Sequence, residues 1–339
     1  MPSRLLLFLS LAVGLSAQPA RLEFRWPTPN HAWEQGRPIE DYIQPTISGD
    51  PESGTFGCIR SGGGQFHEGI DIKAISRDRT GEPADPVSAA MAGVVRYVNP
   101  HPGNSNYGRY IVIEHPDLVP AVYTLYAHLA RIETGVRPGV TVRAGDVIAL
   151  MGRSEGSLAI PKERAHVHFE IGLRLTDSFD GWYHRRGFGS PNDHGIWNGM
   201  NLMGFDPLDF LRQWRTHRVA DFQQYFDQRK AVVRVRIASS RVPDFITRYP
   251  SLLRRPMTSN LMLVAGWELE CDSTGLPFGW TPLTLAELGG QRDGTVRIVA
   301  ADQATLRAWR CKSLVRERRG GLEPGSDLET VLQLLFGFR

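Results

Sequence analysis

The stretch Phe66-His67-Glu68-Gly69-Ile70-Asp71-Ile72 is the one on which the rest of the chain depends. It places an imidazole and a carboxylate four residues apart, with a glycine between them and apolar residues on either side. Histidine and aspartate are both ligands that zinc accepts. A single pair of this kind is common, and most such pairs are surface residues or a local hydrogen bond. The pair becomes informative only if other segments supply a third ligand and a base.

The third ligand comes from His166-Val167-His168-Phe169-Glu170. Residues i and i+2 of a strand point to the same face, so both histidines can face one centre while Val167 and Phe169 pack on the other side. The alternative is a pair of solvent-facing histidines on an exposed sheet. A further histidine, His128, follows a strand-like segment. A catalytic zinc needs three protein ligands and an open position, which leaves two histidines for protons and developing charge.

The segments around these histidines read as short strands separated by turn signals. Between residues 66 and 175, β-branched and apolar runs alternate with glycine bends and show little helical periodicity. This pattern predicts a mainly β unit, a compact antiparallel sandwich or barrel-like domain. The expected strands lie within 86–98, 107–115, 121–128, 136–150 and 165–173.

The change in sequence pattern along the chain predicts a catalytic domain over 46–215 and an accessory domain over 220–339. An extended segment at 18–45 comes before the first domain. Asp206 suits the cap and Pro207 the first turn of a helix that closes it. Residues 174–205 form an aromatic-rich insertion that either lines the groove or packs against the domain. The accessory domain is expected to be a smaller α/β unit of unknown type, with strands near 232–237, 261–269 and 296–300 and a helix at 328–336.

The N-terminal residues 1–17 read as a signal peptide. Arg4 is followed by the apolar run Leu5 to Leu15 and a small-residue cleavage site ending at Ala17. The alternative, a membrane anchor, needs a longer run of roughly 18 residues or more. We therefore expect a secreted or periplasmic protein of the cell envelope, with no membrane span after cleavage. The net charge of +3 is too mild to indicate nucleic acid.

Three cysteines allow one disulfide in an oxidising compartment. Cys271 with Cys311 is the natural pairing, because both lie in the C-terminal part, but the other pairings with Cys58 stay open. Three scattered cysteines do not make a cysteine-rich zinc site, so a metal here would be held by histidine and carboxylate. Among the remaining histidines, His115 is expected to face solvent after its strand, and His184 and His194 are expected to be surface residues.

The order of these motifs resembles the M23 (lysostaphin/LytM-type) zinc endopeptidases. The resemblance rests on His67-x-x-x-Asp71, then Leu125-Tyr126-Ala127-His128-Leu129, then His166-x-His168-Phe169-Glu170-Ile171, and covers about 46–212. It implies that His67, Asp71 and His168 are the ligands of one zinc ion per chain. It also implies that His166 is the general base and His128 the second catalytic histidine. Glu170 lies on the same face of the strand as His166 and His168, so its carboxylate is placed to accept a hydrogen bond from a ligand histidine. The charged turn at 152–164 is longer than the family's.

The resemblance implies an exported zinc metalloendopeptidase that hydrolyses peptide bonds of bacterial peptidoglycan, either cross-links or stem peptides. Two alternatives stay open. One is a non-catalytic relative that binds peptidoglycan and regulates other wall hydrolases, which the presence of all five residues argues against. The other is a zinc peptidase with a non-wall protein substrate. The accessory domain offers a surface for wall anchoring or for a protein partner.

Overall fold

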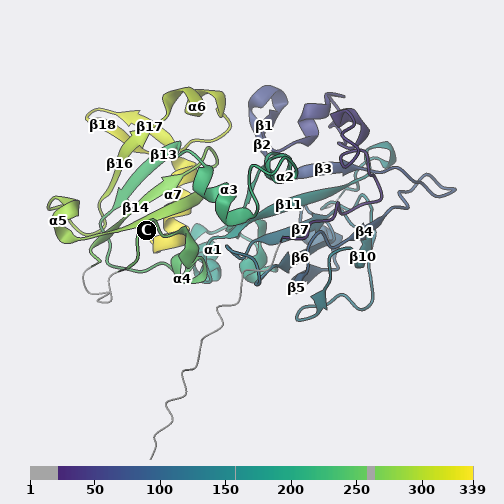
Figure 1. Ribbon diagram of the computed structural model, residues 1–339, viewed down its shortest axis with the longest axis horizontal. Helices are drawn as coiled ribbons and strands as arrows, with labels where there is room; N and C mark the ends of the chain where they lie inside the picture. The colour runs from purple at the N-terminus through teal and green to yellow at the C-terminus, as the bar shows by residue number, and fades with distance from the viewer. Residues whose placement is uncertain (1–21, 157, 258–263, 339) are drawn as a thin grey trace, which may run out of the picture.

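A computed structural model describes residues 22–156, 158–257 and 264–338 of the chain (Figure 1). The expected signal peptide lies outside these residues. Two bodies of β-structure stand side by side, the N-terminal one built around β11 and the C-terminal one around β13 and β14. Within the described ranges, no helix has the length and apolar character needed to cross a bilayer.

The largest sheet of the N-terminal body is antiparallel and is organised around strand β11 (His166–Arg174), in which every residue is buried. One edge of β11 pairs with β7, and the other edge pairs first with β3 and then with β12. This double pairing explains the near-continuous burial of the strand. The remaining strands continue the sheet in the order β7-β6-β5-β9, with the bounds β3 (Ile70–Lys73), β5 (Gly93–Asn99), β6 (Tyr110–Glu114), β7 (Tyr123–Ala127), β9 (Thr141–Val142) and β12 (Leu202–Phe205).

Two smaller sheets complete this body. A three-stranded sheet has the order β4-β10-β8, and a hairpin is formed by β1 and β2. Their bounds are β4 (Pro86–Ser88), β10 (Val147–Leu150), β8 (Arg131–Ile132), β1 (Gly57–Arg60) and β2 (Gln65–His67). The mainly β, antiparallel prediction is confirmed, although the sheets of the described residues stay open and no barrel closes.

The core of the N-terminal body lies under the odd-numbered residues of β11. Val167, Phe169 and Ile171 have no exposed surface, and each such side chain contributes about 1.5–3 kcal/mol on burial. The N-terminal segment packs on the same layer, because the Phe24 ring meets Phe169 at a centroid distance of 6.4 Å. The predicted helix is present as α2 (Pro207–Arg215), whose cap Asp206 accepts hydrogen bonds from two backbone N–H groups.

The C-terminal body is a smaller α/β unit, as predicted. Its four-stranded antiparallel sheet has the order β15-β14-β13-β16, with β13 (Val233–Ile237), β14 (Gly266–Cys271), β15 (Pro277–Leu283) and β16 (Val296–Ala301). The apolar helix α7 (Ser326–Phe336) packs on it, with Phe336 against Trp280. The remaining elements are α3 (Phe222–Gln228), α4 (Asp244–Arg248), α5 (Leu285–Leu288), α6 (Gln303–Ala308), β17 (Val315–Arg318) and β18 (Gly321–Pro324).

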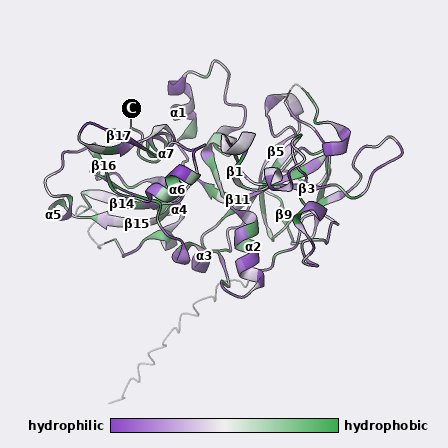
Figure 2. Ribbon diagram, turned by 90° about the horizontal axis from the view of Figure 1, so that it is seen from above, coloured by the Kyte–Doolittle hydropathy of each residue, from purple (hydrophilic) through white to green (hydrophobic). Residues whose placement is uncertain are grey.

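The two bodies share one continuous apolar core. Viewed from above, α2 and α3 lie between them (Figure 2), and the stacked rings of Phe210 and Phe222 join the two helices at 4.2 Å. The predicted insertion also contributes, because its helix α1 (Phe179–Arg186) carries Trp182, whose Nε1–H donates to Gln333 on α7. The domain boundaries inferred from the sequence stay a prediction, since buried contacts run across them.

A disulfide between Cys58 and Cys311 links the hairpin β1–β2 to the segment after α6. The pairing of Cys271 with Cys311 that the sequence suggested is therefore wrong. Cys271 is the last residue of β14 and is fully buried as a free thiol. Both views place α6 beside β1 (Figures 1 and 2). Proximity in sequence misleads here, because the chain returns from the C-terminal body to the first hairpin over a separation of 253 residues.

Candidate metal centre and its cleft

The register between β3 and β11 brings two of the expected ligands together. Asp71 stands directly opposite His168 in this antiparallel pair. Side chains opposite each other on one face of an antiparallel pair have Cβ atoms about 4.5–5.5 Å apart. His166, two residues earlier on β11, faces the same side, and its Nε2 is 3.3 Å from Asp71 Oδ1. Strand alternation thus places both histidines as the sequence predicts.

The third residue, His67, ends strand β2 and reaches the same point. Its Nε2 lies 3.0 Å from His168 Nδ1 and 3.1 Å from Asp71 Oδ1, and the remaining side of the triangle, between His168 Nδ1 and Asp71 Oδ1, is also 3.1 Å. Ligands bound tetrahedrally at about 2.0–2.1 Å are separated by about 3.3 Å, so these three atoms nearly match a zinc ligand set. The three side chains are all buried and form one group able to hold a metal ion.

Gly69 allows the loop between His67 and Asp71 to pass close to β11. A Cβ atom at Gly69 would lie 2.3 Å from the carbonyl oxygen of Phe169 and 2.9 Å from Glu170 Cγ. Any larger residue would push the loop away from the strand that carries His168. The glycine therefore matters because the backbone of β11 is close, rather than because space is short between the two ligands.

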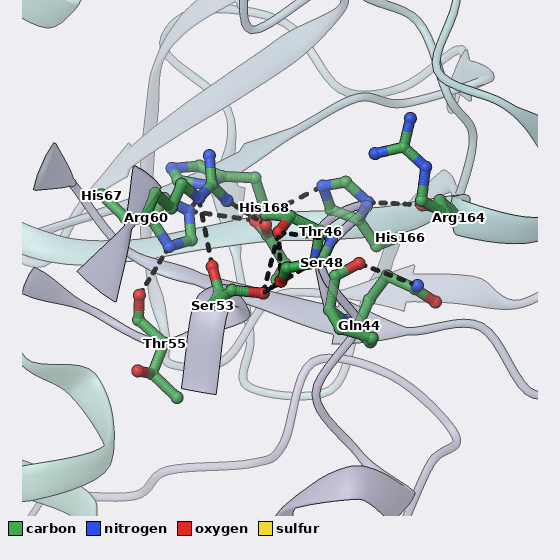
Figure 3. A network of polar contacts seen from close by, with 12 residues as sticks. Gln44, Thr46, Ser48, Ser53, Thr55, Arg60, His67, Arg164, His166 and His168 are labelled. Carbon is green, nitrogen blue, oxygen red and sulfur yellow. Dashed lines mark hydrogen bonds and ion pairs between the residues drawn. The ribbon is translucent and has the colours of Figure 1, made fainter. Parts of the chain in front are cut away.

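Hydrogen bonds fix which nitrogen of each ligand histidine faces the centre. His67 Nδ1–H donates to the carbonyl oxygen of Thr55 at 2.7 Å, which leaves the lone pair on Nε2 (Figure 3). His168 Nε2–H donates to Glu170 Oε1 at 3.0 Å, which leaves the lone pair on Nδ1. Partners of this kind orient metal-binding imidazoles and select their tautomer. Both rings are thus set to present a lone pair to the same point.

Glu170 is itself held by two tyrosines. Tyr107 donates its hydroxyl hydrogen to Oε1 at 2.6 Å, and Tyr123 donates to Oε2 at 2.8 Å. The carboxylate is buried, so these contacts replace the water that it would otherwise need. Burial and the negative charge of Glu170 raise the pKa of both phenols well above the usual value, which keeps them protonated as donors.

The second oxygen of Asp71 is held by an arginine that the sequence does not single out. Arg60, the last residue of β1, donates from Nη2 to Asp71 Oδ2 and from Nε to the carbonyl oxygen of Ser53 at 3.1 Å (Figure 3). This leaves Oδ1 alone to face the two ligand histidines. The carboxylate is thereby set for one-oxygen coordination.

The two other histidines of the set stand beside the triangle with their rings in contact. His128 and His166 have centroids 4.9 Å apart. His166 Nδ1–H donates to the carbonyl oxygen of Arg164 at 2.7 Å, and His128 Nδ1–H donates to that of Ser154 at 2.9 Å. Nε2 of His128 is therefore left to take or hold a proton, and Nε2 of His166 faces Asp71 Oδ1 at 3.3 Å. His128 adopts a left-handed φ of 62°, which turns the chain sharply after β7.

Charge coupling is strong within this buried group. Burial alone would raise the pKa of Asp71, but His166 and His67 outweigh it and hold the pKa well below the usual value. Burial also opposes charge on His168, yet its hydrogen bonds to Asp71 and Glu170 raise its pKa to about 9. For His128, burial and the neighbouring histidines lower the pKa well below 6.5. A cation at the centre would take the place of the proton on His168.

The group lies in an open cleft of about 800 Å³. Its lining includes Arg60 and Phe66, Glu155 and Arg164, and Asn198 to Met200 of the predicted insertion. The C-terminal part of the insertion therefore lines the cleft. It also packs on the sheet, because Tyr110 of β6 donates its hydroxyl hydrogen to the carbonyl oxygen of Trp197 at 3.3 Å.

Other sequence candidates lie away from the cleft. The expectation that His115 faces solvent is wrong, because its side chain is fully buried and forms hydrogen bonds with the Ala92 carbonyl oxygen and the Thr124 hydroxyl. His194 is also buried, with its ring bonded to Tyr97 and Asn104, because the aromatic loop folds back on β5 and β6. His184 is exposed, as expected. Arg60 and the two tyrosines on Glu170 were missed, since nothing in their local sequence marks them.

A buried set of two imidazoles and one carboxylate at the base of an open cleft, with free histidines beside it, is the arrangement of a metal-dependent hydrolase. Residues 65–179 match the family model described as Peptidase family M23. This part of the chain belongs to that family and forms a metalloendopeptidase domain. The match includes all five histidine and aspartate residues of the centre. No curated protein matches the chain in sequence.

Several solved structures are similar to the chain over part of its length. They include the catalytic domain of the prophage-encoded M23 protein EnpA from Enterococcus faecalis, in mutant form, with 23% identity, 38% of this chain and 79% of that chain covered, and a TM-score of 0.27. For a zinc-containing peptidase from Vibrio cholerae the identity is 28%, the match covers 44% of this chain and 37% of that chain, and the TM-score is 0.29. For the catalytic domain of lysostaphin from Staphylococcus simulans the identity is 21%, the match covers 47% of this chain and 87% of that chain, and the TM-score is 0.29. Because these TM-scores are low, the assignment rests on the match over residues 65–179.

Proposed function

We propose that this chain is an exported zinc endopeptidase that hydrolyses peptide bonds of bacterial peptidoglycan. The observation that carries the proposal is the convergence of His67, Asp71 and His168 within 3.1 Å of one another at the base of the cleft. The donor set of two imidazoles and a carboxylate fits zinc, and an open side remains for water or substrate. Membership of residues 65–179 in an endopeptidase family supports the reaction class.

The proposed roles follow from the contacts of each side chain. His67, Asp71 and His168 hold the zinc ion. When bound, zinc acts as a Lewis acid on the scissile carbonyl and lowers the pKa of water towards about 7. His166 takes the proton of the attacking water through Nε2, since its Nδ1–H is engaged with the Arg164 carbonyl. His128 is the second catalytic histidine: its Nδ1–H donates to the Ser154 carbonyl, so its Nε2 can accept a hydrogen bond from the attacking water and steady it.

Export is supported by two features. Residues 1–17 have the pattern of a signal peptide, and the described part of the chain contains the disulfide Cys58–Cys311. Disulfides form and persist in oxidising compartments and are rare in the cytosol. Together these features support the cell envelope as the proposed place of action, where peptidoglycan is the abundant peptide-bearing polymer.

Digestion of purified peptidoglycan tests the activity and the bond together. The mature protein should solubilise walls and create new amino termini, and the released fragments identify the bond. His166→Ala should abolish release while the protein still binds walls. Walls left intact by the zinc-loaded protein, with binding retained, would instead favour a non-catalytic regulator. Cleavage of casein-like proteins at equal rates to walls would favour a non-wall substrate.

A further inference from the structure

A second cavity adjoins the cleft on the side of the C-terminal body. A side pocket of about 260 Å³ shares Phe66, Glu68, Gly199 and Met200 with the cleft wall. Its far walls come from Trp182 and from residues that the C-terminal body supplies, namely Thr274, Lys312, Asp327, Thr330, Val331 and Leu334. A peptide lying in the cleft therefore has beside it a cavity that two parts of the chain build jointly.

The C-terminal wall of this pocket is held in place against the hairpin that carries His67. The disulfide Cys58–Cys311 ties the two segments covalently. Trp309 packs its ring against Phe66 at a centroid distance of 6.4 Å, and the Arg310 guanidinium donates to the carbonyl oxygen of Gly62. Lys312 follows directly after Cys311, so its position relative to the metal centre is set by these contacts.

Lys312 presents an ammonium group without a carboxylate partner. Its Nζ lies 3.8 Å from the centroid of the Phe66 ring, the residue before His67. Within the described residues, no carboxylate oxygen comes within 4.0 Å of Lys312 Nζ, and Asp327 on the same pocket wall instead accepts a hydrogen bond from the Ser313 backbone at 2.6 Å. Lys312 is half-buried, and burial lowers its pKa, while the negative charges of Asp327, Glu68 and Asp272 act in the opposite direction. None of these carboxylates forms an ion pair with Lys312, so its ammonium group has room to bind a carboxylate of a ligand.

We propose that this side pocket is a substrate subsite in which Lys312 binds a carboxylate of the peptide, away from the scissile bond. The apolar walls formed by Trp182, Val331 and Leu334 receive the aliphatic part of the same residue. Glu68 is exposed to water, so its charge is largely screened and does not replace the missing partner. The C-terminal body thereby selects substrates that carry a free carboxylate. This inference rests on the proposed endopeptidase function.

The test compares a synthetic stem peptide with free carboxylates and the same peptide with those groups amidated. Binding is measured by calorimetry on the zinc-loaded full chain carrying His166→Ala, so that the peptide stays intact. Adding Lys312→Gln should weaken binding of the free acid about tenfold and leave the amide within about twofold. Lys312→Arg should restore most of the affinity. Lys230→Gln is the matched control, because Lys230 is exposed on the same body and lines a different cavity.

Equal weakening of both peptides by Lys312→Gln, no weakening, or no binding of the free acid by the parent protein would overturn the subsite. Thermal unfolding of each variant shows whether the fold is retained, and Lys312→Arg separates loss of charge from loss of packing. The two proposals fail in different ways. If walls are not cleaved while binding of the free acid depends on Lys312, the proposed function alone is overturned. If walls are cleaved while binding does not depend on Lys312, the subsite alone is overturned.

Discussion

Asp71 faces His168 across the β3–β11 pair, and its two oxygens have separate tasks: Oδ1 lies 3.1 Å from His168 Nδ1, while Oδ2 accepts a hydrogen bond from Arg60. One oxygen of the carboxylate thus faces the proposed cation site, and the other is held in position by the arginine. The pairing register sets the distance between the two strands' ligands, and the arginine sets the orientation of the carboxylate.

Replacing Arg60 with Met should weaken zinc binding by about 10-fold or more, because Asp71 then loses the contact that orients it. The affinity is measured by competition with a chromophoric chelator at fixed pH. Arg96→Met is the control, since Arg96 pairs with Glu114 on the same body but away from the cleft. An Arg60→Met protein with the zinc affinity of the parent would show that the contact is incidental.

Replacing Glu170 with Gln should lower both stability and zinc affinity. The carboxylate accepts from three donors, on His168, Tyr107 and Tyr123, and an amide has only one acceptor oxygen. At least one buried donor loses its partner, at a cost of about 1–3 kcal/mol in the free energy of unfolding. Urea unfolding of the zinc-free protein measures this cost.

Tyr123→Phe serves as the comparison for Glu170→Gln. It removes one donor and leaves the His168 contact in place, so it should reduce stability while changing zinc affinity less than Glu170→Gln does. Equal effects of both variants on zinc affinity would contradict the assignment of Glu170 as the residue that orients His168.

The disulfide assignment predicts a thiol count. The unreduced chain in denaturant should show one reactive thiol, Cys271, and the reduced chain should show three. In the folded protein Cys271 should not react, because it is fully buried and burial raises its thiol pKa. Peptide mapping without reduction should join the fragments containing Cys58 and Cys311. A fragment joining Cys271 to either partner would overturn the assignment.

Stability should fall in acid partly because of His115. Burial lowers the pKa of this histidine from 6.5 to about 4, so the unfolded chain binds a proton that the folded one excludes. Above pH 6.5 the buried neutral imidazole costs no stability. As the pH falls from 6.5 towards 4, the free energy of unfolding decreases by about 3 kcal/mol at most. The free energy of unfolding of His115→Gln should therefore depend less on pH over this range than that of the parent.

His184→Gln is the control for the pH dependence, because His184 is exposed and should leave the slope unchanged. The comparison is made on the zinc-free protein, so that loss of metal in acid does not add to the slope. If His115→Gln and the parent lose stability in parallel between pH 6.5 and 4, the buried neutral state of His115 is wrong.

The sequence could predict features that follow from local rules, whereas the assignment of His67, Asp71 and His168 as metal ligands came from the family resemblance and stays a prediction. Strand alternation alone places His166 and His168 on one face of β11 and Val167 in the core, and the structure has this arrangement. The cap at Asp206 likewise depends on neighbouring residues only. In each case the deciding interactions lie within a few residues of one another.

What the sequence could not predict depends on contacts between distant segments. Arg60 reaches Asp71 because a hairpin packs over the centre, and that hairpin is tied to Cys311 from far along the chain. The burial of His115 requires knowing that Thr124 lies beside it on the neighbouring strand. The side pocket at Lys312 exists only where the two bodies meet. None of these relations leaves a periodic or motif-like signal.

The zinc content of the purified chain and of two variants that differ only at β11 tests the metal centre directly. We expect about one zinc per chain in the parent and in His166→Ala, and almost none in His168→Ala, with all three proteins folded by circular dichroism. A folded parent protein that takes up no zinc, or a His168→Ala protein that keeps its full complement, would contradict it.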